Sequence, residues 1–234
     1  MEAIVLAGGR AERLGDAAAG KPKALVHVAG RPLAAYQLAA LAKAGVGRVI
    51  VSCAAGQEEL FEAELSGLGV EIVAVGEREP LGRGGGLRHA AAAREESGDV
   101  FALNGDELFD LDLSALLARQ RETDAAATIA VAPLVSPFGV VELGEQDVVS
   151  GFAESPRLPH WVSCGIYVLA PEALARLPER GDHERTTFPA LAAEGRLRAF
   201  RHEGLWITVN TPKDLRYAEE QLAAGALTKV GGLG

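Results

Sequence analysis

LAGGRAERLGDAAAGKPKAL, residues 6–25, begins at the end of a short apolar run and then becomes rich in glycine and basic residues. The apolar run predicts a strand. Gly8 and Gly9 have no side chains, so a ligand can approach the backbone and the amide N–H groups can point at an anion. Arg13 and Lys23 add positive charge from the same loop. The stretch predicts a strand followed by a phosphate-binding loop, although a tight turn flanked by solvated basic residues fits it equally well.

Short β-rich runs alternate with helical patterns through the first half of the chain. The predicted strands are 3–7, 48–53, 70–75, 100–104 and 127–132, and the predicted helices lie near 32–45, 57–67, 84–96 and 113–122. Regular alternation of strand and helix favours a mostly parallel sheet with helices on both faces. The predicted fold class is therefore α/β, with a doubly wound, mixed, mostly parallel sheet.

The pattern changes after residue 133. FGVVELGEQDVVSGFAE (138–154) is typical of a hairpin-like pair of strands, and HWVSCGIYVL (160–169) of a returning strand. Helices are predicted near 171–178, 187–194 and 212–224. We expect a β-rich extension that covers one end of the sheet. Because no repeat or linker is evident, the prediction is one domain over 1–227, divided into halves at 1–133 and 134–227, with a loose tail at 228–234.

Composition narrows the class of protein. The chain is 48% hydrophobic and 24% charged, which is typical of a globular protein, and its net charge of −9 disfavours nucleic acid as a partner. No apolar run approaches the roughly 18 residues of a membrane span, and the start does not resemble a signal peptide. We expect a cytoplasmic monomer or homodimer without a membrane partner. Cys53 and Cys164 are expected to be reduced core residues, because no CxxC spacing occurs.

Two common phosphate-binding motifs do not match the opening loop. GDAAAGKP (15–22) nearly matches GxxxxGK[ST], but Pro22 stands where that motif needs a hydroxyl. No set of glycines has the GxGxxG spacing, and GRGGGL (82–87) ends in leucine. The five histidines show neither HxH nor HxxxH spacing, so no zinc or iron site is expected.

The order of several motifs is more specific. LAGGRAERLG followed by KPKALVHVAGRPL resembles the LAGGxGxRL and PKxLxxVxGxP signature of the sugar-1-phosphate nucleotidyltransferase superfamily. EPLGRGGGLRHA (79–90), LNGDELFDLDL (103–113), FGVVEL with GFAESP and VSCGIYVL, and GLWITVNTPKDL (204–215) follow in that family's order. The resemblance covers most of the chain. It implies a Rossmann-like nucleotidyltransferase fold, in which 1–133 is the nucleotide-binding half and 134–227 the sugar-binding and closing half.

The resemblance also implies a reaction, in which an NTP and a sugar 1-phosphate give an NDP-sugar and pyrophosphate. The sugar phosphate attacks the α-phosphorus, so cations and backbone donors must stabilise the growing charge, and no protein nucleophile is needed. Arg13 is assigned to the leaving pyrophosphate and Lys23 to the α-phosphate, and both are predicted catalytic residues together with Asp106. The implied nucleotide-binding residues are Leu6, Ala7, Gly8, Gly9, Ala11, Glu79, Pro80, Gly84 and Gly85.

The implied cofactor is Mg²⁺ or Mn²⁺. Asp106 follows the predicted strand 100–104, at the end where ligands bind in open α/β sheets, and is the first predicted metal ligand. Many relatives place a second acid where this chain has Thr208, and others where it has Asn210. An amide oxygen can coordinate a hard cation, so Asn210 is the second predicted ligand. The alternative is that Asn210 or Thr211 caps the next helix.

Nearby acids and the sugar side complete the predicted site. Glu107, Asp110 and Asp112 are interpreted as solvated loop carboxylates rather than ligands. The family often has a lysine that grips the sugar phosphate where this chain has Ser155. The implied residues for the sugar phosphate are Gly139, Glu154, Arg157 and Gly165.

The resulting prediction is a sugar-1-phosphate nucleotidyltransferase whose partners are an NTP and a sugar 1-phosphate. GTP with a mannose- or heptose-like sugar is favoured by resemblance to short relatives. Two alternatives stay open. One is a related transferase that acts on a cofactor-precursor phosphate. The other is a catalytically weak regulatory protein that binds NTP or NDP-sugar, which Thr208, Asn210 and Ser155 suggest.

Overall fold

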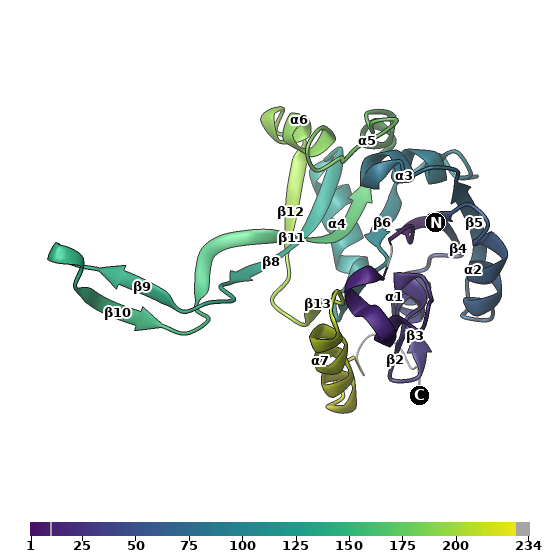
Figure 1. Ribbon diagram of the computed structural model, residues 1–234. Coiled ribbons are helices and arrows are strands. Elements are labelled where there is room, and N and C mark those ends of the chain that lie inside the picture. Colours follow the sequence, from purple (N-terminus) through teal and green to yellow (C-terminus); the bar gives the residue numbers. More distant parts are fainter. Residues whose placement is uncertain (10, 228–234) are drawn as a thin grey trace.

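A computed structural model of the chain describes residues 1–9 and 11–227. Over these residues, the main sheet has seven strands in the order β12-β8-β11-β6-β1-β4-β5 (Figure 1). Its strands are β1 (Glu2–Leu6), β4 (Arg48–Ala54), β5 (Glu71–Glu77), β6 (Val100–Asn104), β8 (Ala127–Val135), β11 (Arg157–Leu169) and β12 (Leu197–Arg201). The predicted tail 228–234 lies outside the described residues.

Small ribbons and helices complete the described part of the chain. The ribbons pair β2 (His27–Val28) with β3 (Arg31–Pro32), β7 (Glu107–Phe109) with β13 (Trp206–Thr208), and β9 (Val140–Leu143) with β10 (Val149–Ala153). The α-helices are α1 (Leu33–Lys43), α2 (Glu58–Glu64), α3 (Gly82–Ala91), α4 (Leu113–Thr123), α5 (Pro171–Ala175), α6 (Thr187–Ala193) and α7 (Pro212–Ala223). The 3₁₀ helices are η1 (Glu12–Ala18), η2 (Lys23–Leu25) and η3 (Glu145–Asp147). Of the helices within residues 1–9 and 11–227, none has the length and apolar character that crossing a membrane requires.

The strand directions confirm the predicted fold class. β1 runs parallel to β4 and β6, β5 runs parallel to β4, and β12 runs parallel to β8. β11 is antiparallel to both β6 and β8, which makes the sheet mixed. All five strands predicted in the first half are present, whereas the short strands β2, β3, β7, β12 and β13 were not predicted.

Both faces of the sheet are covered, which explains why the interior strand β1 is apolar from Ala3 to Leu6. In β1, Ala3 and Val5 point into a buried cluster that includes residues of α1, α2 and α4. Ile4, between them, points into a second cluster that includes residues of α3, α5 and α6. This alternation follows from the two-residue period of a strand, and each fully buried branched side chain contributes about 2 kcal/mol.

A third cluster joins the two ends of the chain. Leu14 and Ala18 of η1 are buried with Ile207 of β13 and Ala218 of α7. In Figure 1, η1 and α7 accordingly lie next to each other beside the lower part of the sheet. This packing places the segment after β13 beside the opening loop.

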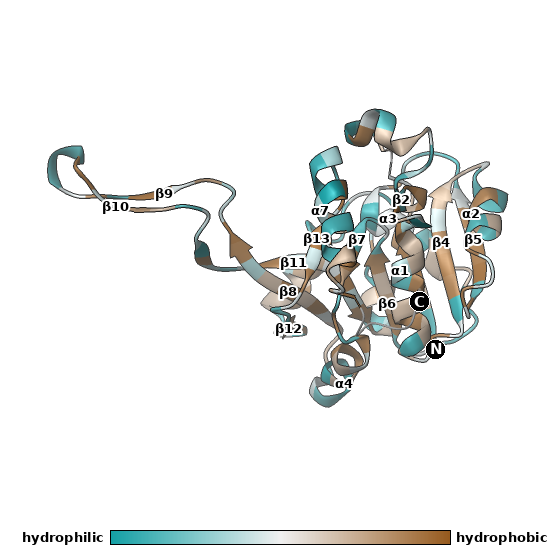
Figure 2. Cartoon of the chain, turned by 90° about the horizontal axis from the view of Figure 1, so that it is seen from below, coloured by the Kyte–Doolittle hydropathy of each residue, from teal (hydrophilic) through white to brown (hydrophobic). Residues whose placement is uncertain are grey.

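The predicted hairpin is confirmed, but its position differs from the expectation. Residues 138–154, here called the arm, project away from the body rather than cover one end of the sheet (Figure 1). In the described residues β9 and β10 pair only with each other, and irregular pairing of β11 with β8 marks where the arm departs. The arm's strands are coloured as hydrophobic and its tip as hydrophilic in Figure 2. Its exposed apolar side chains are Phe138, Val141, Leu143, Val148, Val149 and Phe152.

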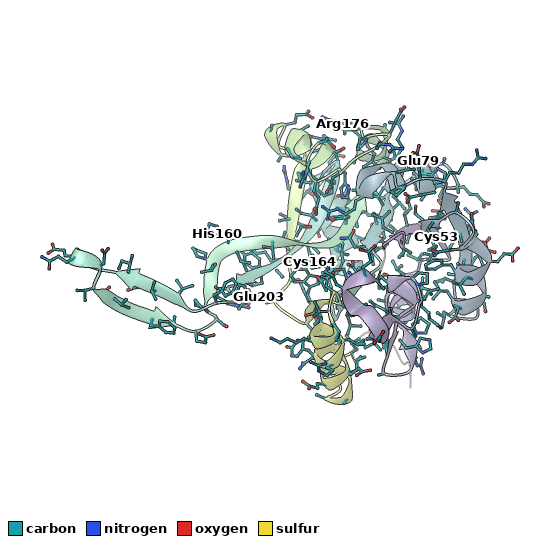
Figure 3. The ribbon with its side chains drawn as sticks, viewed as in Figure 1. Cys53, Glu79, His160, Cys164, Arg176 and Glu203 are labelled. Carbon is teal, nitrogen blue, oxygen red and sulfur yellow. The ribbon has the colours of Figure 1, made fainter. Side chains whose placement is uncertain are left out.

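The two cysteines are confirmed as core residues. Cys53 and Cys164 are both free and buried (Figure 3). Burial raises the pKa of each thiol to about 12. A thiol with such a pKa stays protonated at neutral pH and is a poor nucleophile, so neither cysteine contributes reactive chemistry.

A buried carboxylate fixes the start of the sheet. Glu2 accepts hydrogen bonds from Arg48 Nη1 (2.9 Å) and Arg94 Nε (3.2 Å), and from the backbone amides of Glu95 (2.9 Å) and Glu96 (3.1 Å). Burial by itself would raise the pKa of Glu2, but these donors outweigh it and hold the pKa below 4.5. The carboxylate therefore links β1 and β4 to the segment after α3.

We expect Glu2→Gln to lower the free energy of unfolding at pH 7 by about 2 kcal/mol, because it removes the charge that four donors surround. A carboxyl with a depressed folded-state pKa stabilises the protein above its unfolded pKa and stops doing so as the pH falls through the folded value. The deficit should therefore shrink below pH 4.5. Urea unfolding from pH 7 to pH 3 measures it, with the exposed Glu122→Gln as the control. A deficit that stays constant across this range contradicts the assignment.

Candidate active site

A cavity of about 1060 Å³ opens at the carboxyl ends of β1 and β6. Leu6 at the end of β1 lies opposite Asn104 at the end of β6, and Gly105 N donates to Leu6 O over 2.8 Å. A Cβ on Gly105 would lie 2.7 Å from Leu6 O, so this close approach requires glycine. The cavity is lined by the opening loop, residues 77–83 after β5, residues 104–107, and Thr208 and Asn210.

Two cations, a carboxylate and an amide oxygen meet in this cavity. The Lys23 ammonium donates to Asp106 Oδ2 and, over 2.5 Å, to Asn210 Oδ1. Arg13 Nη2 donates to the same Asn210 oxygen over 2.6 Å. The structure therefore brings together the four residues that the sequence predicted as catalytic or metal-binding, from three distant segments. Their individual roles stay predictions.

Local contacts explain how Asn210 reaches this point. Val209 N donates to Asp106 O over 2.9 Å, which holds the segment after β13 against the end of β6. Thr211 is the N-cap of α7, in a reciprocal capping box with Asp214. Because Thr211 caps the helix, the Asn210 side chain is available to the cavity.

Glu107 is a buried carboxylate at the edge of the cavity. Its side chain is about 3% exposed, and its Oε2 accepts hydrogen bonds from Trp206 Nε1 and Thr208 Oγ1, both over 2.8 Å. Burial, and then the neighbouring charge of Asp106, raise the pKa of Glu107 well above its usual range. Its interpretation as a solvated loop acid is wrong, because β7 carries it inward against β13.

The other two acids of this segment also have structural partners. Asp112 is the N-cap of α4 and accepts hydrogen bonds from the amides of Ser114 and Ala115. Asp110 Oδ1 lies 3.1 Å from His202 Nε2. Neither lines the cavity, and their exclusion as ligands stays a prediction.

Glu77, at the end of β5, was not predicted as a site residue. It lines the cavity and accepts hydrogen bonds from Ser52 Oγ (2.7 Å) and Leu81 N (3.0 Å). The sequence signal was an acid at the carboxyl end of a parallel strand, the same signal that selected Asp106. Its contacts fix the turn that leads into α3.

The predicted nucleotide-binding residues divide into two groups. The lining of the cavity includes Leu6, Ala7, Gly8, Gly9, Ala11, Glu79 and Pro80. Gly84 and Gly85 do not line it. They are buried against residues 178–183, where a Cβ on Gly84 would lie 2.7 Å from Pro178 Cγ and one on Gly85 2.6 Å from Glu179 O. These glycines allow close packing of α3 against another part of the protein.

The four predicted sugar-phosphate residues do not line the cavity. Gly139 and Glu154 belong to the arm. Arg157 begins β11, and its Nη1 lies 3.5 Å from the carboxylate of Glu203, near where the arm leaves the body (Figure 3). Gly165 lies deeper, with a positive φ of 69° and with Glu107 Oε1 3.1 Å from where its Cβ would be. The sugar site therefore stays a prediction.

Comparison with known proteins defines the class. The Nucleotidyl transferase family model matches residues 2–225. The chain is 33% identical to a mannose-1-phosphate guanylyltransferase of Mycobacterium tuberculosis, covering 96% of this chain and 65% of that protein. It is 32% identical to mannose-1-phosphate guanylyltransferase catalytic subunit beta of Drosophila pseudoobscura pseudoobscura, covering 91% and 60%. The structure of an inositol-1-phosphate CTP transferase from T. maritima superposes with a TM-score of 0.75 at 24% identity, covering 98% and 95%.

The chain therefore belongs to the nucleotidyl transferase family. The resemblance to sugar-1-phosphate nucleotidyltransferases that the motifs indicated is confirmed, and so is the Rossmann-like fold. The chain spans about 60 to 65% of the length of the curated relatives described above.

We expect Gly85→Ala to lower the Tm by several degrees, because the added methyl group would be forced against Glu179 O and overpacking costs about 1–3 kcal/mol. Gly9→Ala is the matched control, since nothing lies within 4 Å of a Cβ at Gly9. Thermal unfolding of both variants without ligand measures the difference. Equal Tm values for the two variants would contradict a packing role for Gly85.

Proposed function

We propose that this protein transfers a nucleoside monophosphate from an NTP to a sugar 1-phosphate and releases pyrophosphate. GTP and a mannose- or heptose-like sugar are the favoured substrates. The observation that carries the proposal is the convergence of Arg13, Lys23, Asp106 and Asn210 in one cavity of a nucleotidyl transferase fold. The mannose-1-phosphate guanylyltransferase relatives support the choice of base and sugar.

The reaction needs positive charge and positioning more than acid–base chemistry. An oxygen of the sugar phosphate forms a bond to the α-phosphorus while the bond to the β-phosphate oxygen breaks, and pyrophosphate leaves. Lys23 and Arg13 supply fixed positive charge where the phosphoryl oxygens become more negative. Gly8 and Gly9 leave the backbone open to the phosphates beside them.

The residues of the cavity fit a divalent cation. The Asp106 carboxylate and the Asn210 amide oxygen both accept hydrogen bonds from the Lys23 ammonium, so two oxygen atoms already lie next to one positive charge. Asp106 and Asn210 would hold Mg²⁺, which commonly takes one or two protein oxygens and completes its shell with phosphate and water. Within the described residues no cluster of three or more His, Cys, Asp or Glu side chains could hold a metal by itself. When bound, the ion would neutralise phosphate charge.

Pyrophosphate release tests the function directly. The purified protein is incubated with Mg²⁺, each of the four NTPs, and the 1-phosphates of mannose, glucose and a heptose. We expect turnover that requires both substrates and is fastest with GTP. Release with a cofactor-precursor phosphate but with no sugar phosphate would favour the related transferase, and binding without turnover in any combination would favour a regulatory protein.

Arg13→Ala and Lys23→Ala should each lower kcat/KM by roughly 10² or more while the protein stays folded, because each removes a charge that stabilises the transition state. The exposed Arg119→Ala, in α4 and outside the lining of the cavity, is the control for a general loss of positive charge. Steady-state kinetics with circular dichroism measure both properties. A folded Lys23→Ala protein with unchanged kcat/KM would remove Lys23 from the catalytic residues.

A further inference from the structure

The family resemblance described above implies an acid in the closing segment of many members at the position where this chain has Thr208. Thr208 lies in β13, directly opposite Glu107 in β7, in an antiparallel pair. Side chains at directly opposite positions lie on the same face of a two-stranded ribbon, with Cβ atoms about 5 Å apart. A carboxylate at position 107 therefore lies on the face that an acid at position 208 would occupy.

The structure shows that the two side chains meet. Thr208 Oγ1 donates to Glu107 Oε2 over 2.8 Å, so the carboxylate lies at the end of the Thr208 side chain. Trp206 Nε1 donates to the same oxygen and fixes the carboxylate. Glu107 and Thr208 both line the cavity that holds Asp106 and Asn210. Glutamate is one methylene longer than aspartate, and this length lets a side chain from β7 reach toward β13.

The second oxygen of this carboxylate is available. No donor from residues 1–9 and 11–227 forms a hydrogen bond to Glu107 Oε1. Because Glu107 lines the cavity, this oxygen can accept from or coordinate a ligand bound there. The neighbouring cations Arg13 and Lys23 are already bonded to Asn210 and Asp106. Within residues 1–9 and 11–227, Glu107 is therefore a second carboxyl group of the site that forms no salt bridge with either cation.

We propose that Glu107 supplies the second carboxylate of the cation site, in place of the acid that relatives carry at position 208. Glu107 stands directly opposite Thr208 in the β7–β13 ribbon, so an acid at either position lies on the same face. Thr208 has become its hydrogen-bond donor. This inference rests on the proposed function, because it names the residue that completes the cation site of that reaction.

The proposal is tested by removing the acid at position 107 and placing an acid at position 208. The variants are Glu107→Gln, Thr208→Asp and the double substitution Glu107→Gln/Thr208→Asp. The control is Asp110→Asn, which changes a nearby acid that does not line the cavity. Electron paramagnetic resonance measures the affinity for Mn²⁺ alone and for Mn²⁺ with the α,β-methylene analogue of GTP. Pyrophosphate release measures the Mg²⁺ concentration needed for half-maximal rate, and thermal unfolding measures stability.

We expect Glu107→Gln to weaken Mn²⁺ binding on the order of 10-fold and to raise the Mg²⁺ requirement, since it keeps the shape but loses the charge. Thr208→Asp by itself should lower the Tm, because it places a second carboxylate directly opposite the first. The double substitution should recover most of the Mn²⁺ affinity, whereas Asp110→Asn should bind Mn²⁺ like the wild type. Recovery of Mn²⁺ affinity in the double variant indicates that the lost group is a cation ligand. If Glu107 only positioned Trp206, an acid at position 208 would not restore the affinity.

Mn²⁺ binding that is unaffected by Glu107→Gln overturns the inference, and so does a double variant as weak as the single one. A Glu107→Gln protein that binds Mn²⁺ normally but has a raised KM for the sugar phosphate also overturns it, since the residue then contacts the sugar. These results leave the proposed function in place if the wild type turns over. Conversely, a wild type without turnover overturns the proposed function, while the Mn²⁺ affinities still decide the role of Glu107.

Discussion

The short antiparallel pairing of β7 with β13 is the constraint on which the site depends. It joins residues 107–109 to residues 206–208 and is extended by the hydrogen bond from Val209 N to Asp106 O. The packing of Ile207 and α7 on η1 supports it from the other side. Because β13 is held over the end of β6, Asn210 meets Arg13 and Lys23. Without that pairing, the opening loop would face Asp106 alone.

The sequence predicted the sheet well because burial on both faces makes its strands continuous apolar runs. β2, β3, β7 and β13 were not predicted because two or three residues cannot show a periodic pattern, and β12 (LRAFR) was not predicted because two arginines interrupt its apolar residues. The same limit applies to Glu107. Its position after Asp106 suggests a loop, and only β13, about a hundred residues later, supplies the donors that bury it. The family resemblance marks Thr208 as a position where an acid is expected, but it does not indicate that Glu107 lies opposite Thr208.

Two other sequence patterns predict a local feature without showing what surrounds it. The run at Gly84 and Gly85 correctly indicates that no side chain fits, yet sequence does not say whether a ligand or the protein fills the space. Likewise, FGVVEL is rich in β-forming residues as a buried sheet strand is, while Phe138 in the arm is 74% exposed. The pattern predicts a hairpin, and the irregular pairing within β11 decides where it points. In both cases the local sequence predicts the close approach at the glycines or the hairpin, and only the tertiary structure shows what packs against it.

Lys23 has a consequence for how ligands enter. Its ammonium neutralises the Asp106 carboxylate and donates to Asn210 Oδ1, so the protein provides an internal counter-ion for its own acidic group. An incoming anion that draws Lys23 toward itself uncovers Asp106, and an incoming cation that binds Asp106 releases Lys23. Each partner therefore improves the site for the other, and thermodynamic linkage requires the improvement to be reciprocal. In the proposed reaction, Mg²⁺ and nucleotide would therefore bind cooperatively through the Lys23–Asp106 pair.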